Sequence, residues 1–295
     1  MAVSDNLRGA ALMCAAMVAF TVNDTFMKAV TVDLPVLQAI AMRGLVTSVF
    51  LVAIVWRAGA FAARVGRADR FWLAMRTVGE VLGTFTFLFA LKHMPIANLS
   101  AILQSLPLAV TLAAALFLGA PVGWRRLTAI LIGFTGVMLI IRPGTDAFDR
   151  WSLLGVASVA CVVLRDIATR KLSAAVPSPL VALAAALSVG LSAGLLLPFT
   201  GVVAVSGIQV LQVAGAAAFL IVGYLTVVMT MRVGDISVIA PFRYVSLVAA
   251  ILLGWAVFGQ FPDRWTLVGS AIVVATGIYT FLRERRLARQ AEARP

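Results

Sequence analysis

Residues 179–200 read PLVALAAALSVGLSAGLLLPFT, a run that contains no charged side chain. A helix rises about 1.5 Å per residue, so a run of this length crosses the hydrocarbon core of a bilayer, which is about 30 Å thick. The run is apolar on every face and lacks the alternation of a membrane β-strand. The segment is therefore predicted to be a transmembrane helix.

Further apolar runs of similar length lie on both sides of this segment. The ten predicted spans are 7–30, 35–56, 70–91, 95–118, 124–141, 152–171, 179–200, 208–231, 236–258 and 264–282. Most connections between them are shorter than about 12 residues, which makes neighbouring helices antiparallel. The predicted fold class is all-α and integral to the membrane, with ten transmembrane helices.

The composition of the 295 residues supports this class, because 62% are hydrophobic and only 12% are charged. Soluble domains are about 45–50% apolar and about 25% charged. These values exclude a soluble enzyme, a nucleic-acid-binding protein and a disordered chain. The net charge of +12 is attributed to loops that orient the helices, so the expected surroundings are a lipid bilayer and no nucleic acid.

The basic residues are distributed unevenly between the two sides of the predicted spans. Fifteen Lys and Arg lie on the side of the termini, four lie on the other side, and five lie inside spans. Because positively charged loops remain cytoplasmic, both termini are predicted to be cytoplasmic. Residues 283–295 are predicted to form a basic cytoplasmic tail.

The chain also resembles itself when it is displaced by about 141 residues. The matching pairs are Asp24 with Asp166, Gly83 with Gly223, Thr86 with Thr226, Phe117 with Phe258 and Trp124 with Trp265. The predicted repeats, 8–141 and 152–282, each hold five spans, so the two copies enter the membrane with opposite topology. Inverted repeats are typical of secondary transporters, which bind their cargo between the halves near the middle of the membrane.

Ionisable side chains inside the spans are the main candidates for function. Each costs about 2.5–3.5 kcal/mol at the centre of a bilayer, so it is expected to face the bundle interior or a water-filled cavity. The candidate cavity residues, with the neutral polar side chains included, are Asn23, Asp24, Arg43, Arg76, Glu80, Gln104, Arg165, Asp166, Arg243 and Tyr244.

Two interpretations of these polar residues remain open, because buried polar groups also join helices to one another. A spacing of four residues places Arg76 beside Glu80, and Asp24 beside Lys28, on one helix face. Lys28, near the end of its span, is expected to have a structural role. Asp24, Glu80 and Asp166 are the candidate proton carriers if transport is coupled to protons.

The fourth and ninth spans each contain a proline, Pro107 and Pro241, near a polar residue. Proline frees a backbone carbonyl and bends the helix, as in the discontinuous helices of transporters; a simple packing kink is the alternative. The glycine pairs Gly79/Gly83 and Gly190/Gly194 are expected to allow helices to approach closely. The candidate aromatic residues for stacking on a planar cargo are Phe20, Phe85, Phe87, Tyr224, Phe242 and Trp255.

Several kinds of catalytic site are missing from the sequence. There is no phosphate-binding glycine-rich loop, one histidine (His93), and no cluster with the spacing of metal ligands. The sequence therefore predicts no cofactor, no metal and no enzymatic activity. The two cysteines, Cys14 and Cys161, lie in apolar runs and are interpreted as small hydrophobic residues.

Two stretches resemble the signatures of a known family. The stretch from Ala240 to Tyr244 and on to Asp263 resembles the second EamA repeat, and the stretch from Leu116 to Gly119 and on to Gly136 resembles the first. The resemblance covers about 8–282 and implies the ten-helix drug/metabolite transporter superfamily, with two inverted five-helix repeats around a central cavity. The family's Glu after each turn is replaced here by Ala120 and Gln260.

Shorter segments, including Asn23-Asp24, Gly79-Glu80 and Arg165-Asp166, are most similar to bacterial riboflavin transporters. The resemblance implies a carrier of the bacterial inner membrane that takes up riboflavin by alternating access. The alternatives are an exporter or exchanger of amino acids, S-adenosylmethionine or drugs, and, with less support, a channel or a membrane enzyme.

Overall fold

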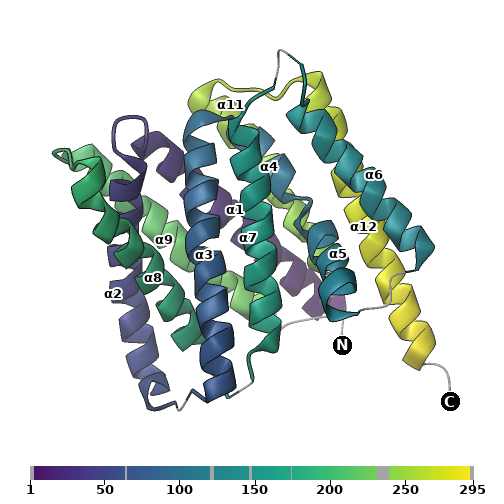
Figure 1. Ribbon diagram of the computed structural model, residues 1–295, viewed down its shortest axis with the longest axis horizontal. Coiled ribbons are helices and arrows are strands. Elements are labelled where there is room, and N and C mark those ends of the chain that lie inside the picture. Colours follow the sequence, from purple (N-terminus) through teal and green to yellow (C-terminus); the bar gives the residue numbers. More distant parts are fainter. Residues whose placement is uncertain are drawn as a thin grey trace. The chain divides into compact units, whose positions relative to one another are not determined.

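The computed structural model describes residues 3–63, 65–119, 123–145, 148–173, 175–230 and 239–292 (Figure 1). These residues form helices and no strand, and ten helical segments are long and apolar enough to cross a membrane. The predicted all-α membrane class is thus confirmed. The ends of the spans agree within a few residues, except around 231–238, which lies outside the described residues. Ala120, which stands in place of the family's Glu, also lies outside them.

The helices follow one another with short connections. They are α1 Val3–Val30, α2 Val36–Arg57, η1 Ala60–Ala62, α3 Arg67–His93, α4 Ile96–Leu103, α5 Leu106–Leu118, α6 Trp124–Ile141, α7 Trp151–Lys171, α8 Ser178–Thr200, α9 Gly207–Thr230, η2 Ala240–Tyr244, α11 Val245–Phe258 and α12 Arg264–Glu292. α12 continues well past the predicted end of its span, into the segment expected to form the basic tail.

Proline and glycine fix where several helices begin and end. Pro35, Pro95 and Pro177 directly precede α2, α4 and α8, where an extended backbone turns into the helix. Gly119 and Gly259 follow α5 and α11 with φ of 64°, a left-handed conformation that suits glycine. The Gly259 N–H donates to the Trp255 carbonyl and the Gln260 N–H to the Gly254 carbonyl, which closes the end of α11.

The chain divides into two compact units. Unit 1 contains Met1–Val22, Met94–Ser152 and Val222–Pro295, and unit 2 contains Asn23–His93 and Leu153–Ile221. Each unit draws helices from both predicted repeats, and α1 and α9 run through both units. The most extensive helix contacts in the units, α2 with α8 and α6 with α12, therefore join the two predicted repeats.

In unit 2, helices cross at glycines. α2 lies along α8 (Figure 1), and a Cβ on Gly44 would be 2.6 Å from the Cα of Gly190. On α3, Gly79 and Gly83 face Cys161 and its neighbours on α7. Close approach is confirmed for Gly79, Gly83 and Gly190, but the prediction was wrong for Gly194, where a Cβ would meet nothing within 4 Å.

In unit 1, α6 lies along α12, and α4 packs on α11. A Cβ on Gly269 would be 2.5 Å from the Gly136 carbonyl oxygen, so the two backbones are in contact. A small core forms around Met13, Ala16, Met17 and Ile239. Each unit thus has one long helix pair that meets at facing glycines.

Candidate functional site

The first polar group of unit 2 joins the last turns of α1 to α2. The Asn23 amide donates to Asp24 Oδ1 at 2.8 Å, and Arg43 Nη1 donates to Asn23 Oδ1 at 3.2 Å. The Asn23 and Arg43 side chains are buried, with 3% and 9% of their surface exposed. The amide therefore links a basic side chain to an acidic one inside the bundle, where buried polar groups need partners.

Lys28 lies one turn further along α1. Its ammonium is buried and donates to the Leu91 carbonyl oxygen, near the end of α3, at 2.8 Å. The C-terminal carbonyls of a helix attract cations. This bond ties the end of α1 to the end of α3, which agrees with the structural role expected for Lys28.

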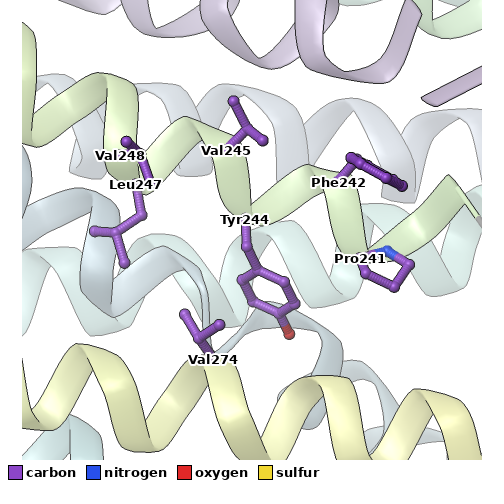
Figure 2. Close-up of a pocket in the computed structure, with 7 residues that line it drawn as sticks. All are labelled: Pro241, Phe242, Tyr244, Val245, Leu247, Val248 and Val274. Carbon is purple, nitrogen blue, oxygen red and sulfur yellow. The ribbon is translucent and has the colours of Figure 1, made fainter. Parts of the chain in front are cut away.

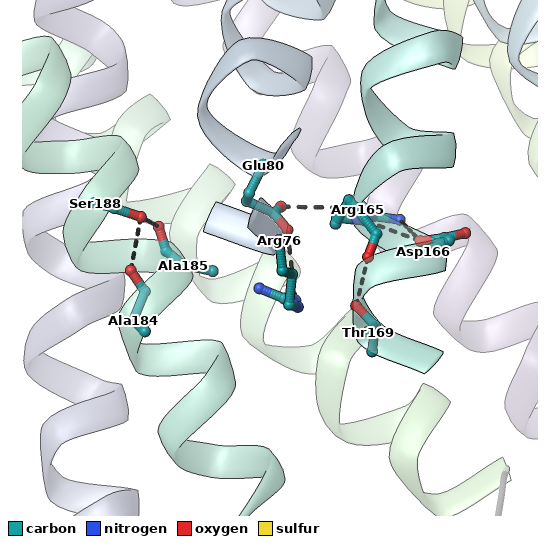
Figure 3. Close-up of polar contacts among 8 residues, drawn as sticks. All are labelled: Arg76, Glu80, Arg165, Asp166, Thr169, Ala184, Ala185 and Ser188. Carbon is teal, nitrogen blue, oxygen red and sulfur yellow. Dashed lines mark hydrogen bonds and ion pairs between the residues drawn. The ribbon is translucent and has the colours of Figure 1, made fainter. Parts of the chain in front are cut away.

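The second polar group of unit 2 lies between α3 and α7. Figure 3 shows the Glu80 carboxylate between Arg76, on its own helix, and Arg165 on α7. Arg165 holds Asp166 firmly, because Nε and Nη2 lie 3.0 and 2.9 Å from Asp166 Oδ1. The contact of Arg165 with Glu80 is longer, at 3.7 Å between Nη1 and Oε1.

Arg76 and Glu80 form the ion pair that their spacing predicts, with 3.5 Å between Nη2 and Oε2. The pair is enclosed, since the side chains are 12% and 11% exposed. Nevertheless Arg76 Nε, Arg76 Nη1 and Glu80 Oε2 are buried without a hydrogen-bond partner among the described residues. This pair has hydrogen-bonding capacity that the described protein groups do not fill.

Glycine explains why these charges can meet. A Cβ on Gly79 would lie 2.8 Å from the Cys161 carbonyl oxygen and 2.9 Å from the Arg165 nitrogen. The missing side chain therefore lets α7 approach α3 at the level of Glu80. Nearby in Figure 3, the Ser188 hydroxyl on α8 donates to the Ala184 and Ala185 carbonyls of its own helix.

In unit 1, the polar residues lie at interruptions of two predicted spans. The fourth span breaks between α4 and α5 at Gln104 and Ser105, just before Pro107, and the ninth span begins with the 3₁₀ turn of η2. The Gln104 amide donates to the Ser246 hydroxyl at 2.7 Å. The two interrupted segments are thus hydrogen-bonded to one another through these side chains.

Tyr244 lies at the end of η2 with its hydroxyl turned toward α12 (Figure 2). A Cβ on Gly277 would lie 1.8 Å from this hydroxyl, so glycine makes room for it. A cavity of about 310 Å³ adjoins the ring and is lined by Pro241, Phe242, Tyr244, Val245, Leu247, Val248 and Val274. Its lining is apolar apart from Tyr244, and Phe242 is the one stacking candidate in it.

The remaining candidates are placed as follows. The Arg243 side chain is exposed, and its carbonyl accepts a bond from the Ser246 hydroxyl at 3.0 Å. Phe20 packs edge-on against Tyr224, with ring centroids 5.6 Å apart, so these two aromatics are occupied with each other. Gln260, which replaces the family's Glu, has a buried Oε1 without a hydrogen-bond partner among the described residues.

Outside the membrane-spanning segments, Arg142 pairs with Asp263 and links the end of α6 to the start of α12. Burial alone would raise the pKa of the Asp263 carboxyl. Hydrogen bonds from Thr266 and the Arg142 guanidinium outweigh burial and hold this pKa below its ordinary value.

The structure therefore divides the ten predicted residues between the units. Unit 2 holds Asn23, Asp24, Arg43, Arg76, Glu80, Arg165 and Asp166, and unit 1 holds Gln104, Arg243 and Tyr244. Ser246 was missed because a lone serine in an apolar run is common. Its position two residues after Tyr244, beside a proline-containing turn, is the signal that marks it.

Comparison with known proteins agrees with this architecture. Residues 7–142 match the model of the EamA-like transporter family. A riboflavin transporter of Rhizobium johnstonii is 30% identical over 73% of this chain and 71% of its own length. An S-adenosylmethionine uptake transporter of Rickettsia felis is 24% identical over 97% of this chain and 96% of its own.

A solved crystal structure shares the fold, with a TM-score of 0.64 and 19% identity over 95% of this chain and 98% of that one. The fold, the matched residues and the relatives agree with one another. The chain belongs to the EamA-like transporter family, within the drug/metabolite transporter superfamily.

Proposed function

We propose that the protein is a secondary transporter that takes up riboflavin across the inner membrane of a bacterium by alternating access. The observation that carries the proposal is the set of buried and half-buried ionisable side chains in unit 2, on helices long and apolar enough to cross a membrane. Such groups are expensive in a membrane and mark cargo or ion pathways. The similarity to riboflavin transporters supports the choice of cargo.

The transport cycle follows from the predicted inverted repeats, 8–141 and 152–282. In such carriers the two repeats rock around a central site and expose it to each side in turn. The hydrogen bond from Gln104 to Ser246 supports this arrangement, because it joins the interrupted span of one repeat to that of the other. Asp24, held by Asn23, is the preferred candidate for proton coupling.

Uptake tests the proposal directly. A riboflavin auxotroph that expresses the chain should grow on limiting external riboflavin, and labelled riboflavin should enter proteoliposomes with saturation. A matched pair of variants separates the site from the scaffold. Glu80→Gln should reduce uptake at least tenfold, and Asp263→Asn, outside the spans, should retain it.

A second cargo has a specific observation in its favour. The similarity to S-adenosylmethionine uptake transporters extends over 97% of the chain, more than the 73% shared with the riboflavin transporter. Saturable uptake of S-adenosylmethionine without rescue of the auxotroph would favour that cargo. Electrical conductance without saturation would instead indicate a channel, and a chemically altered cargo would indicate an enzyme.

A further inference from the structure

The unfilled hydrogen-bonding groups of unit 2 meet at one place on α3. Arg76 offers two donors, Nε–H and the Nη1 group, and Glu80 offers one acceptor, Oε2. All three are buried without a hydrogen-bond partner among the residues that the structure describes. An enclosed guanidinium or carboxylate in this condition is strongly destabilising unless something else supplies the missing bonds.

The neighbouring side chains of Arg165 and Ser188 make their described hydrogen bonds to other groups. Arg165 already directs two nitrogens to Asp166, at 2.9 and 3.0 Å. Its remaining group lies 3.7 Å from Glu80 Oε1, which is attraction without a hydrogen bond. The Ser188 hydroxyl is bonded to carbonyls of its own helix. The Arg76 donors and the Glu80 acceptor therefore remain next to each other without described hydrogen bonds.

The chemistry of the pair restricts what can fill it. A carboxylate or phosphate would suit Arg76 but would be repelled by Glu80, and an ammonium group would meet the opposite conflict. A neutral group with a carbonyl next to an N–H satisfies both partners together. Cyclic amides, imides and ureides carry the carbonyl and the N–H side by side in one plane. Arg76 and Glu80 lie four residues apart on one helix face, so their side chains can contact such an edge together.

We propose that Arg76 and Glu80 together bind the cyclic amide edge of a planar cargo. Arg76 donates to a ring carbonyl, and Glu80 accepts from the adjacent ring N–H. The assignment rests on the proposed carrier function. It identifies the cyclic amide edge as the part of the cargo that Arg76 and Glu80 bind. Because the pair is enclosed in the present conformation, the edge enters in a conformation that opens it, as alternating access provides.

Two probes test the proposal with purified protein in lipid nanodiscs. Riboflavin has one imide N–H between two carbonyls, and 3-methylriboflavin has a methyl group in place of that hydrogen. The wild-type chain should bind riboflavin at least about tenfold more tightly than the methylated probe, the effect of losing one bond to a charged group. If water molecules rather than cargo satisfied Arg76 and Glu80, the protein would not prefer riboflavin over 3-methylriboflavin.

Three variants separate recognition from a structural ion pair. Glu80→Met removes the acceptor, and the double variant R76M/E80M removes the donors and the acceptor together. Both variants should bind the two probes within about threefold of each other. Asp263→Asn, which changes an ion pair outside the spans, should keep the wild-type preference. If Glu80→Met does not fold, the double variant decides, because it removes both charges of the pair and leaves Arg165 paired with Asp166.

The outcomes distinguish this inference from the proposed function. Saturable riboflavin uptake without preference between the probes, or with a preference that persists in the double variant R76M/E80M, overturns the edge assignment and leaves the carrier function intact. Saturable uptake of S-adenosylmethionine without binding of riboflavin also overturns the edge assignment and leaves the carrier function intact. Absence of saturable uptake for both compounds overturns the carrier function and this assignment with it.

Discussion

At the scale of single residues, Tyr244 and Gly277 fit together closely. A Cβ on Gly277 would lie 1.8 Å from the Tyr244 hydroxyl oxygen and 2.9 Å from its Cζ. We therefore expect Gly277→Ala to destabilise the protein by about 1–3 kcal/mol, as overpacked cores do. The loss should appear as a lower apparent melting temperature in detergent.

A second substitution checks the cause of that loss. Tyr244→Phe removes the atom that the new methyl group meets first. The double variant Y244F/G277A should therefore regain part of the stability, with a coupling of about 0.5 kcal/mol or more. Strictly additive losses would show that the clash with the hydroxyl is not the cause.

Asp263 gives a pH dependence whose sign follows from its contacts. Its pKa in the folded protein lies below the ordinary value of 3.8, so it stabilises the fold above that value and loses this effect as the pH falls through the folded pKa. The side chain is 44% exposed, so solvent screening keeps the contribution below about 1 kcal/mol. Melting between about pH 6 and 3 should show a smaller decrease in Asp263→Asn than in wild type.

At this scale the sequence predicts pairs that lie on one helix but not partners on different helices. The Arg76–Glu80 pair follows from its spacing of four residues, and the structure contains it. The bond from Lys28 to Leu91 and that from Gln104 to Ser246 do not follow from spacing, since they join residues far apart in the chain. Only the packing of the helices determines them.

At the scale of helices, the glycines of α2 and α8 form a contact between two backbones. A Cβ on Gly44 would be 2.6 Å from the Cα of Gly190, and backbone atoms have little freedom to move away. Gly44→Ala should therefore separate the helices and lower stability by about 1–3 kcal/mol. Thermal unfolding of the purified variant measures this.

The matched control for that variant lies on α8 itself. A Cβ on Gly194 would meet nothing within 4 Å, so Gly194→Ala should gain only the helix propensity of alanine and be neutral or slightly stabilising. Equal losses in both variants would contradict an effect of the crossing. The sequence pointed to Gly190 and Gly194 alike, because one helix alone does not show which of its glycines faces a neighbour.

Helix ends and interruptions were more predictable than helix partners. Gly119 and Gly259 end α5 and α11, as the repeated signature implies, and the breaks near Pro107 and Pro241 are present. These features depend on local backbone chemistry, which the sequence contains in full. The pairing of α2 with α8 and of α6 with α12 depends on contacts between the repeats, which local patterns do not describe.

At the scale of the whole molecule, the distribution of basic residues predicts that both termini are cytoplasmic. A green fluorescent protein fused to the C-terminus should fluoresce, and alkaline phosphatase fused after Thr145, in the loop that follows α6, should be active. The reverse pattern would contradict the predicted orientation and, with it, the side from which cargo enters.

The ten spans were predictable because each is long, apolar and bounded by charge or turn residues. The family was predictable because its signatures lie at turns and at the interrupted spans. The division into units was not, because Asn23–His93 pack with Leu153–Ile221 across the boundary between the predicted repeats. The charged side chains of α3 and α7 meet only through that packing.

The last helix, α12, runs from Arg264 to Glu292, whereas its apolar span ends at Arg283. The extra turns continue the axis by about 13 Å at 1.5 Å per residue. A fluorophore attached at Glu292 would therefore be carried by a continuous helix rather than by a flexible tail. Its rotational motion would report the tilt of the tenth span, so single-molecule polarisation measurements at this position could follow the proposed transport cycle.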